Sequence, residues 1–343
     1  MLELDGSYGE GGGQLVRTAV ALSAITGRAA TVRNVRAKRD PPGLAPQHAA
    51  AVRAVAALSG ASVEGVELRS RSIAFSPGAL ARGSFRFDVG TAGSVTLLLQ
   101  ALLPVMIASG KPCEATVIGG TDVRMAPPLD YFREVLLALL ARMGASVRLD
   151  ERRRGYYPRG GGEVLVSVSP SRLRPVAFDA PGASRSVSGL AHVANLPEHI
   201  ATRMRASALA QLASVPGLTP DIACRMLGPD DAIGQGGAIV AWAHADGTVL
   251  GAGRVAERGV RAEALGEAVG LELASDLAAG AAVDVHAADQ LLVYFALAGG
   301  GWLTTRAVSV HARTCMWLIE QFLPVRFEVS QAGSLSRIAL AAR

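Results

Sequence analysis

The strongest constraint on the fold of this chain is a sequence pattern that occurs three times. Each copy opens with a strand-like segment ending in aspartate, at residues 4–5, 87–88 and 283–284. A short loop then leads into an apolar, helix-forming run, at residues 15–25, 95–108 and 291–298. Each run is followed by a glycine suited to a helix C-terminus, namely Gly27, Gly110 and Gly299. This recurrence predicts a fold made of repeated units.

The sequence after each opening predicts the fold class. In the first two copies, two prolines lead to a second helical run, at residues 49–58 and 135–141, and then to Gly-Ala-Ser-Val. The third copy shortens this to a helical run at 315–323 and a strand at 325–329. The order strand, helix, strand, helix, strands favours an α+β or layered α/β fold, with three units that each hold a four-stranded sheet and two helices.

One stretch lacks the repeated opening and is interpreted as a smaller inserted α/β domain. It covers residues 186–275, with helices expected at 198–213 and 262–277 and strands near 237–243 and 249–255. We therefore expect a main domain with units one and two at 1–185, the inserted domain at 186–275, and the third unit of the main domain at 276–343.

Composition indicates a large globular protein with a preference for acidic partners. The chain has 343 residues, 50% hydrophobic content and a formal net charge of +5. Basic residues cluster in two runs, at 33–39 and 152–159. The second run brackets Tyr156 and Tyr157, for which base stacking and packing of a hairpin on the core are equal alternatives.

Several classes of protein lose support. The three cysteines, Cys113, Cys224 and Cys315, lie far apart without metal-type spacing, which predicts a reducing, cytoplasmic setting. The start of the chain does not resemble a signal peptide, and the longest apolar run is too short to cross a bilayer, so no membrane role is expected. Walker, Rossmann, esterase and zinc-protease signatures do not occur.

The first glycine-rich loop, residues 5–14, is a candidate phosphate site. Glycines allow a ligand to approach the backbone, and the helix that follows offers free N–H groups. Glu10 stands among these glycines, and a carboxylate beside phosphates calls for a divalent cation. A tight turn without any ligand is an equally strong interpretation of the glycines alone.

Histidine is the best candidate for a covalent nucleophile. Lys38 and Lys111 are the only lysines, and neither lies in a Lys-x-Asp-Gly context. Neutral imidazole is nucleophilic near pH 7 and can pass a phosphoryl group onward. His311 follows the alternating segment 307–310 and is expected at a strand-to-helix junction, although composition alone favours a structural role. We interpret His48 as a helix-surface residue and His286 as a turn residue.

The chain resembles the RNA 3′-terminal phosphate cyclase family over most of its length. The resemblance is carried by ordered motifs at 5–17, 35–39, 42–44, 47–48, 93–100, 119–122, 126–128, 130–132, 155–158, 160–162, 288–290, 311 and 322–325.

The resemblance implies a three-step reaction that uses ATP. Histidine, here His311, attacks the α-phosphate of ATP, releases pyrophosphate and holds AMP as a phosphoramidate. AMP then moves to the 3′-terminal phosphate of an RNA, and the neighbouring 2′-hydroxyl expels it to leave a 2′,3′-cyclic phosphate. Adenylylation supplies the leaving group that a phosphate monoester lacks.

The resemblance also implies roles for individual residues. Glu10 is expected to bind Mg²⁺ or Mn²⁺, and Gln14 and Arg17 to reach phosphates. Arg36, Arg39 and Gln47 are candidates for the RNA phosphate or the triphosphate. Pro128 and His286 would flank adenine, with Asp289 at a polar edge. The expected ATP contacts are Gln14, Arg17, Gln100, Pro128, Val285, His286, Ala287, Ala288 and Asp289.

Two alternatives to an active cyclase have less support from the sequence. A non-catalytic relative that acts in RNA processing and ribosome biogenesis would keep the fold without the nucleophile, and His311, Glu10 and Asp289 argue against it. An enolpyruvyl transferase would use a similar repeated unit, but its lysine-rich pocket does not suit a chain with two lysines. The expected partners are RNA 3′-phosphate ends and no membrane, and a homodimer is left open.

Overall fold

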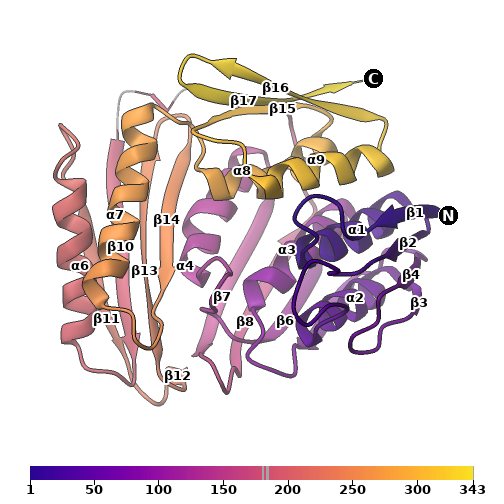
Figure 1. Cartoon of the computed structure of the whole chain (residues 1–343), viewed down its shortest axis with the longest axis horizontal. Coiled ribbons are helices and arrows are strands. Elements are labelled where there is room, and N and C mark those ends of the chain that lie inside the picture. Colours follow the sequence, from indigo (N-terminus) through magenta and orange to yellow (C-terminus); the bar gives the residue numbers. More distant parts are fainter. Residues whose placement is uncertain (180, 183–184, 343) are drawn as a thin grey trace.

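The computed structural model describes residues 1–179, 181–182 and 185–342. Helices and sheets are layered, with helices α1, α2, α3, α8 and α9 lying between sheets (Figure 1). The expected α+β, layered α/β class is confirmed. No helix in the described ranges is long and apolar enough to cross a membrane.

The first sheet contains residues from the N-terminal part of the chain. Its strands, in spatial order, are β1 (Leu2–Asp5), β2 (Ala30–Arg33), β4 (Ile73–Ser76) and β3 (Ser62–Glu64). The pair β1 and β2 is parallel, and the other two pairs are antiparallel. Helices α1 (Gly13–Thr26) and α2 (Pro46–Ser59) cover it, and both end at a glycine in the left-handed region, Gly27 and Gly60.

The second sheet repeats this order with longer strands. It runs β5 (Gly83–Asp88), β6 (Cys113–Gly119), β8 (Gly162–Ser169) and β7 (Ser146–Gly155), and β12 (Ala232–Ile233) adds to its edge. Helix α3 (Val95–Ala108) follows β5. The second expected helix is divided into α4 (Leu129–Tyr131), a π-helical turn η1 (Phe132–Leu136) and α5 (Leu137–Arg142).

The third sheet corrects one expectation. Its order is β9 (Ala177–Phe178), β15 (Gly301–Thr305), β17 (Leu335–Ala342) and β16 (Val325–Ala332), with helices α8 (Val285–Ala298) and α9 (Val310–Phe322). Residues 283–284, expected to form its first strand, are not in a strand. That place is taken by β9, which precedes the insertion and pairs in parallel with β15. All three sheets therefore share one strand order and pairing sense, which favours the repeated units.

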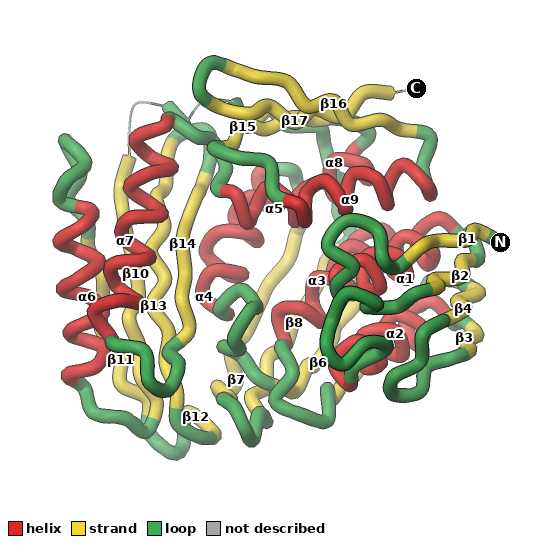
Figure 2. Tube along the Cα trace, viewed as in Figure 1, coloured by secondary structure: helices red, strands yellow, loops and turns green. Residues whose placement is uncertain are grey.

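A fourth sheet belongs to the segment expected as the inserted domain. Its strands are β11 (Asp221–Leu227), β10 (Arg185–Ala194), β13 (Gly236–Ala245) and β14 (Val249–Val255). Two helices, α6 (His199–Leu212) and α7 (Ala262–Ala279), cover one face of this sheet (Figure 2). Strands β10 and β11 had no sequence prediction. Helix α7 continues beyond the expected boundary at residue 275, and the division into domains remains our proposal.

Two hydrophobic cores correspond to these parts of the molecule. One core extends through the first three sheets and their helices, and the other lies between the fourth sheet and helices α6 and α7. Helix α3 is apolar on all sides and almost wholly buried, as expected for a helix between layers. The three sheets thus hold one another in place, while the inserted sheet has a separate core.

We predict that Gly266→Val destabilises the protein by about 3 kcal/mol, because this glycine allows α7 to approach α6 closely. A side chain there would collide with the carbonyl oxygen of Met204. The matched control Ala264→Val places the same side chain on the exposed face of α7 and should cost only about 0.5 kcal/mol. Urea unfolding measures both, and equal losses would contradict the close packing.

Candidate active site

The two ends of the chain meet at His311. The structure places this histidine in the first turn of α9 rather than after a strand, because residues 307–309 are not in a strand and Ser309 caps the helix. The Nε2 atom of His311 lies 3.1 Å from Oε2 of Glu10, and the Nδ1 atom lies 2.8 Å from Oε1 of Gln14. Both ring nitrogens are thus held by residues of the glycine-rich loop and helix α1.

The glycine-rich loop fits closely against its neighbours. Gly9 has a φ of 59°, and a side chain at this position would collide with the hydroxyl of Thr314 on α9. A side chain at Gly13 would collide with the imidazole of His48. Glycine is therefore required at both positions for Glu10 to reach His311.

Further contacts fix the loop to α9. The rings of Tyr8 and Trp317 stack with their centroids 4.0 Å apart. The Lys38 ammonium donates a hydrogen bond to the carbonyl oxygen of Gly9 at 2.9 Å. These contacts hold the backbone on either side of Glu10, so the carboxylate is positioned before any ligand binds.

Positive charge surrounds this carboxylate. Arg39 lies 3.1 Å from Glu10, and the buried Arg17 is near enough to Glu10 and Asp289 to interact with their charges. Burial lowers the pKa of Arg17 to about 10, so its guanidinium stays charged at neutral pH. Burial and the nearby arginines lower the pKa of His48 to about 3, so its imidazole is neutral. His48 is buried, and the expectation of a helix-surface position was wrong.

The remaining basic-loop candidates have contacts of their own. Arg36 donates hydrogen bonds to the carbonyl oxygens of Pro41 and Gly43. Burial lowers the pKa of Arg36, and the like charge of Arg39 lowers it further. Gln47 packs against Gly93, at the start of the second unit's helix. These contacts keep the loop 36–43 folded beside the glycine-rich loop.

Helix α8 supplies another wall of the site. Asp284 caps it by accepting from the N–H groups of His286 and Ala287, and it also accepts from the hydroxyl of Tyr131. The first turn of the helix contains the expected nucleotide residues Val285, His286, Ala287, Ala288 and Asp289. The Asp284 carboxylate thus occupies the N-terminal end of α8 and fixes the orientation of this turn.

His286 is held from the inserted domain. Its Nε2 atom lies 3.0 Å from Glu272 of α7, and Glu272 pairs with Arg254 of β14 at 2.6 Å. The hydrogen bond to Glu272 raises the pKa of His286. Pro128 packs beside Gly253 of the same strand, so β14 contacts Pro128 directly and is linked to His286 through Glu272.

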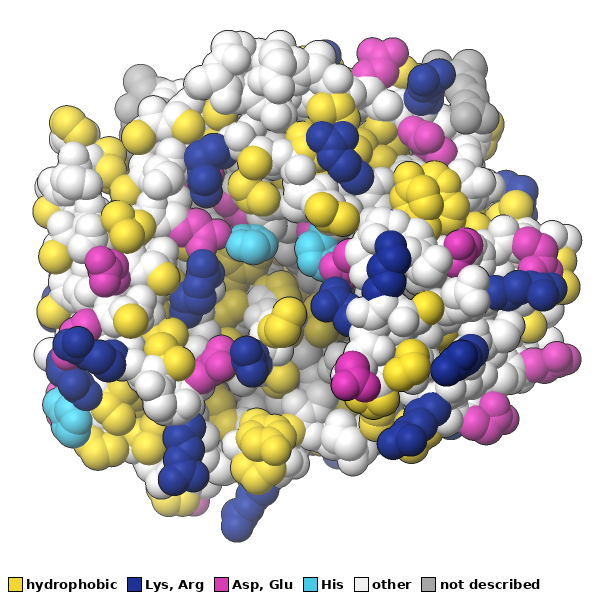
Figure 3. All heavy atoms as spheres, in the orientation of Figure 1, with side chains coloured by type: hydrophobic (Ala, Val, Ile, Leu, Met, Phe, Trp, Pro, Cys, Tyr) yellow, Lys and Arg dark blue, Asp and Glu magenta, His cyan; other side chains and the backbone are white. Residues whose placement is uncertain are grey.

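A small cavity of about 40 Å³ lies beneath these groups, lined by Gln14, Arg17, Gln100, Asp289, Gln290 and Cys315 among others. Gln100 donates to the side-chain oxygen of Gln290 at 2.8 Å. Burial raises the pKa of Asp289 to about 7, although the charges of His311 and His286 act to lower this pKa. Four residues predicted from distant motifs, Gln14, Arg17, Gln100 and Asp289, thus line one cavity. Histidine side chains lie at the rim of the hollow in Figure 3.

Comparison with known proteins gives the family. A family model described as RNA 3′-terminal phosphate cyclase matches residues 8–329. The chain belongs to this family. An RNA 3′-terminal phosphate cyclase from Nitrosospira multiformis is 54% identical over 98% of this chain and 96% of its own. Those from Pyrobaculum neutrophilum and Methanococcoides burtonii are 42% and 39% identical, over 97% and 99% of this chain and 96% and 100% of theirs. The expected family and the prediction of an enzyme are confirmed.

Several residues of this cyclase-family site had no sequence signal. Tyr8, Trp317 and Thr314 hold the glycine-rich loop, and Glu272 and Arg254 hold His286. Thr314, Trp317, Glu272 and Arg254 do not lie in a pattern that distinguishes them from ordinary surface or core residues, and Tyr8, although part of the glycine-rich loop 5–14, had no role predicted for it. Only the tertiary contacts reveal their part in the site.

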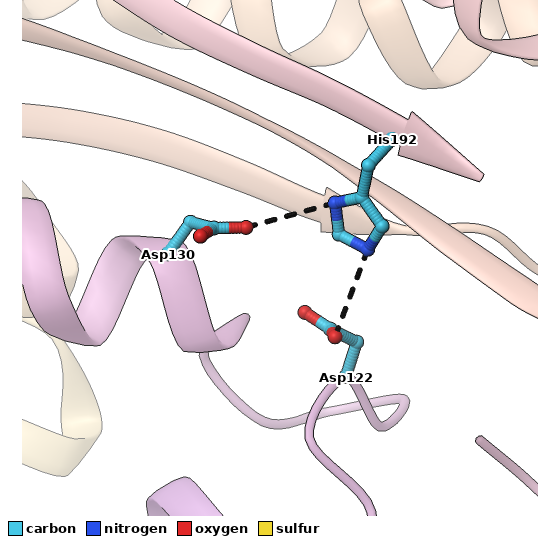
Figure 4. A group of neighbouring side chains, drawn as sticks. All are labelled: Asp122, Asp130 and His192. Atoms are coloured by element: carbon cyan, nitrogen blue, oxygen red, sulfur yellow. Dashed lines mark ion pairs between the residues drawn. The ribbon is translucent and has the colours of Figure 1, made fainter. Parts of the chain in front are cut away.

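A buried cluster of Asp122, Asp130 and His192 has the composition of a metal site (Figure 4). However, the Arg154 guanidinium already lies 3.1 Å from Asp122 and 2.7 Å from Asp130. Burial and the same guanidinium lower the pKa of His192, so its ring is neutral. The carboxylates are therefore neutralised by arginine, and the cluster joins the second sheet to β10 of the inserted sheet rather than holding a cation.

We predict that Glu10→Gln lowers the pKa of His311. The hydrogen bond to Glu10 raises this pKa most, and Asp289 raises it further, while burial and Arg17 lower it. Removal of the carboxylate charge should therefore shift the loss of the imidazole proton to lower pH. NMR titration of the histidine ring resonances of the ATP-free protein measures this shift. His48 serves as an internal control that should not titrate near neutral pH, and an unchanged His311 titration would contradict the contact.

Proposed function

We propose that this enzyme uses ATP to convert an RNA 3′-terminal phosphate into a 2′,3′-cyclic phosphate, through a covalent His311–AMP intermediate. The main support is the placement of His311 in the first turn of α9, with its two ring nitrogens against Glu10 and Gln14. The relatives at 39–54% identity carry the cyclase name, which supports the reaction class. A cytoplasmic setting is part of the proposal, supported by three cysteines that are free of disulfides.

The contacts of His311 favour Nε2 as the attacking atom. When the Nδ1–H group donates a hydrogen bond to Oε1 of Gln14, loss of the other ring proton leaves a lone pair on Nε2. In the first step this lone pair attacks the α-phosphorus of ATP, a bond from Nε2 to phosphorus forms, and the phosphorus–oxygen bond to pyrophosphate breaks. Gln14 thereby orients the ring and sets its tautomer.

The next two steps use AMP as a leaving group. An oxygen of the RNA 3′-phosphate attacks the phosphorus of the AMP group, and the bond to Nε2 breaks. The 2′-hydroxyl oxygen then attacks the phosphorus of the RNA phosphate, the bond from this phosphorus to the bridging oxygen of AMP breaks, and the hydroxyl proton passes to the departing AMP phosphate. Arg17, Arg39 and the N-terminus of α9 lie around His311 and would neutralise the negative charge of these phosphates.

The surroundings of Glu10 fit a divalent cation that is shared with a nucleotide. Mg²⁺ in nucleotide sites often takes one carboxylate and completes its shell with phosphate and water oxygens. Glu10 is a single, largely buried carboxylate beside the nucleophile, which matches this need, and its partner Arg39 is 40% exposed and can turn away to admit a cation, unlike the buried Arg154. A bound Mg²⁺ or Mn²⁺ would supply positive charge to the triphosphate, and Glu10 would hold it.

The nucleotide itself would lie between α8, α9 and β14. His286 and Pro128 would flank the adenine, and Gln100 and Asp289 would contact polar groups of the nucleotide. Val285, Ala287 and Ala288 would present the N-terminal turn of α8. Arg36 and Gln47, from the first unit, are proposed for the RNA phosphate together with Arg39.

We predict that incubation with α-labelled ATP and a divalent cation yields an acid-labile AMP adduct on the protein, and that His311→Ala abolishes it. The reason is that the label stays with the denatured protein only if a side chain is covalently bonded to the labelled phosphorus. The control His199→Ala changes an exposed histidine at the start of α6 and should keep the adduct. If His311→Ala retains the full adduct, the assignment is wrong.

We further predict that Glu10→Ala slows adduct formation by at least about tenfold, while the affinity for ATP in the absence of metal changes little. The motivation is the position of this carboxylate beside the nucleophile. Single-turnover labelling and equilibrium binding of ATP measure the two effects. Glu3→Ala, which removes an exposed carboxylate from β1, is the control. Equal losses of ATP affinity and rate would count against a role specific to the metal.

A further inference from the structure

A large cleft lies between the second sheet and the inserted domain. Its volume is about 1690 Å³. The main-domain wall contains residues 122–124 and the turn at 156–159, and the opposite wall contains the start of α6 and the loop 255–262. Small-molecule sites usually measure roughly 300–1,000 Å³. The volume therefore exceeds the need of one nucleotide and suits a chain-like ligand.

The cleft begins where the proposed adenine site ends. Strand β14 passes both places: Gly253 packs beside Pro128, Arg254 joins Glu272 and His286, and Val255 lines the cleft. A single strand thus connects the nucleotide wall to the cleft wall. An RNA whose 3′ end reaches His311 must leave the site along some adjoining surface, and this cleft is next to the proposed adenine site, since Val255 of its lining directly follows Arg254 in β14.

The charge of the cleft favours a polyanion. Five arginines line it: Arg124, Arg159, Arg203, Arg258 and Arg261. Its two carboxylates, Asp122 and Glu257, are paired with Arg154 and Arg124 respectively. Arg159 and Arg258 are exposed, and neither forms an ion pair with any residue in the described part of the chain. Two guanidinium groups are therefore available for phosphates.

The turn between β7 and β8 presents an aromatic ring at the edge of this cleft. Tyr157 is 78% exposed, whereas the neighbouring Tyr156 is 2% exposed and packs in the core. The two alternatives for this tyrosine pair thus apply to different residues. Gly160 fixes the turn, because it has a φ of 64° and lies against the backbone of Ala92. An exposed tyrosine on a fixed turn is suited to stacking on a base.

We propose that this cleft binds the single-stranded RNA that leads to the reacting 3′ end. Tyr157 stacks on a base, and Arg159 and Arg258 contact phosphates upstream of the end. Single-stranded ends are recognised through unstacked bases on aromatic side chains, which is what Tyr157 offers and what a paired duplex would not use. The proposal rests on the proposed cyclase function for the identity of the ligand, and it extends that function from the terminal phosphate to the body of the RNA.

The test compares two RNAs that share the same terminal sequence and 3′-phosphate. One is a single-stranded oligonucleotide long enough to fill the cleft, and the other is a dinucleotide. Fluorescence anisotropy measures binding of the labelled oligonucleotide, and the dinucleotide is measured as a competitor. Tyr157→Ala should weaken binding of the oligonucleotide by about fivefold or more. Tyr157→Phe, which keeps the ring, should bind as the native protein does.

The charge contacts have their own readout. The double variant Arg159→Gln/Arg258→Gln should make the negative slope of log affinity against log salt shallower by about 1.4, as expected for two lost phosphate contacts on a single strand. The control Arg82→Gln/Arg326→Gln removes the same charge from exposed arginines elsewhere and should leave the slope unchanged. The dinucleotide should bind equally well to all variants.

Two outcomes would overturn the proposal. Oligonucleotide binding that is unaffected by the cleft variants would show that RNA follows another surface, and equal losses for the dinucleotide would show that the variants disturb the active site. Formation of the AMP adduct needs no RNA and should be normal in every cleft variant. Absence of the adduct in the native protein would instead refute the proposed reaction, while the binding result would still decide the role of the cleft.

Discussion

The arrangement of the molecule depends on one buried guanidinium. Arg154 is wholly buried and contacts Asp122, Asp130 and Glu151 of the main domain, as well as His192 of the inserted sheet. Removing one partner from such a group leaves an uncompensated buried charge, at a cost of about 3–5 kcal/mol. The network therefore fixes the angle at which the inserted sheet meets the second sheet. That angle places β14 beside the proposed nucleotide and opens the cleft beyond it.

Many of the helices could be predicted because the local pattern of apolar residues and glycines indicates where they lie. The apolar runs before Gly27 and Gly299 give helices that end at these glycines, and the inserted helices fall close to their expected ranges. Strand β9 could not be predicted in this way, because a strand of two residues is too short to show an alternating pattern. Its partners in β15, Trp302 and Leu303, also lie far along the chain. Strands β10 and β11 were missed as well. Pairing between distant segments, rather than propensity, decides these elements.

The sequence predicted which residues belong to the candidate site, but not how their side chains are arranged in space. His311, Glu10 and Asp289 were selected from separate motifs, and the structure brings them together. The residues that hold them were not predictable, because the stacking of Tyr8 on Trp317 has no signature in sequence. The roles of these residues in catalysis stay predictions that the labelling and titration experiments decide. The reason is general: motifs mark the groups that touch a ligand, while their supports vary with packing.

The meeting of Glu10 and Gln14 with His311 also has a kinetic meaning. Gln14 and His311 are 297 positions apart in sequence, so their contact closes one of the longest loops the chain can form. Contacts of such high sequence separation cost the most loop entropy and form late in folding. Helices α1 and α9, which carry Gln14 and His311, pack against each other although nearly the whole chain lies between them. Under the proposed mechanism, formation of the AMP adduct on His311 would therefore report complete folding, since it requires both terminal units to be in place.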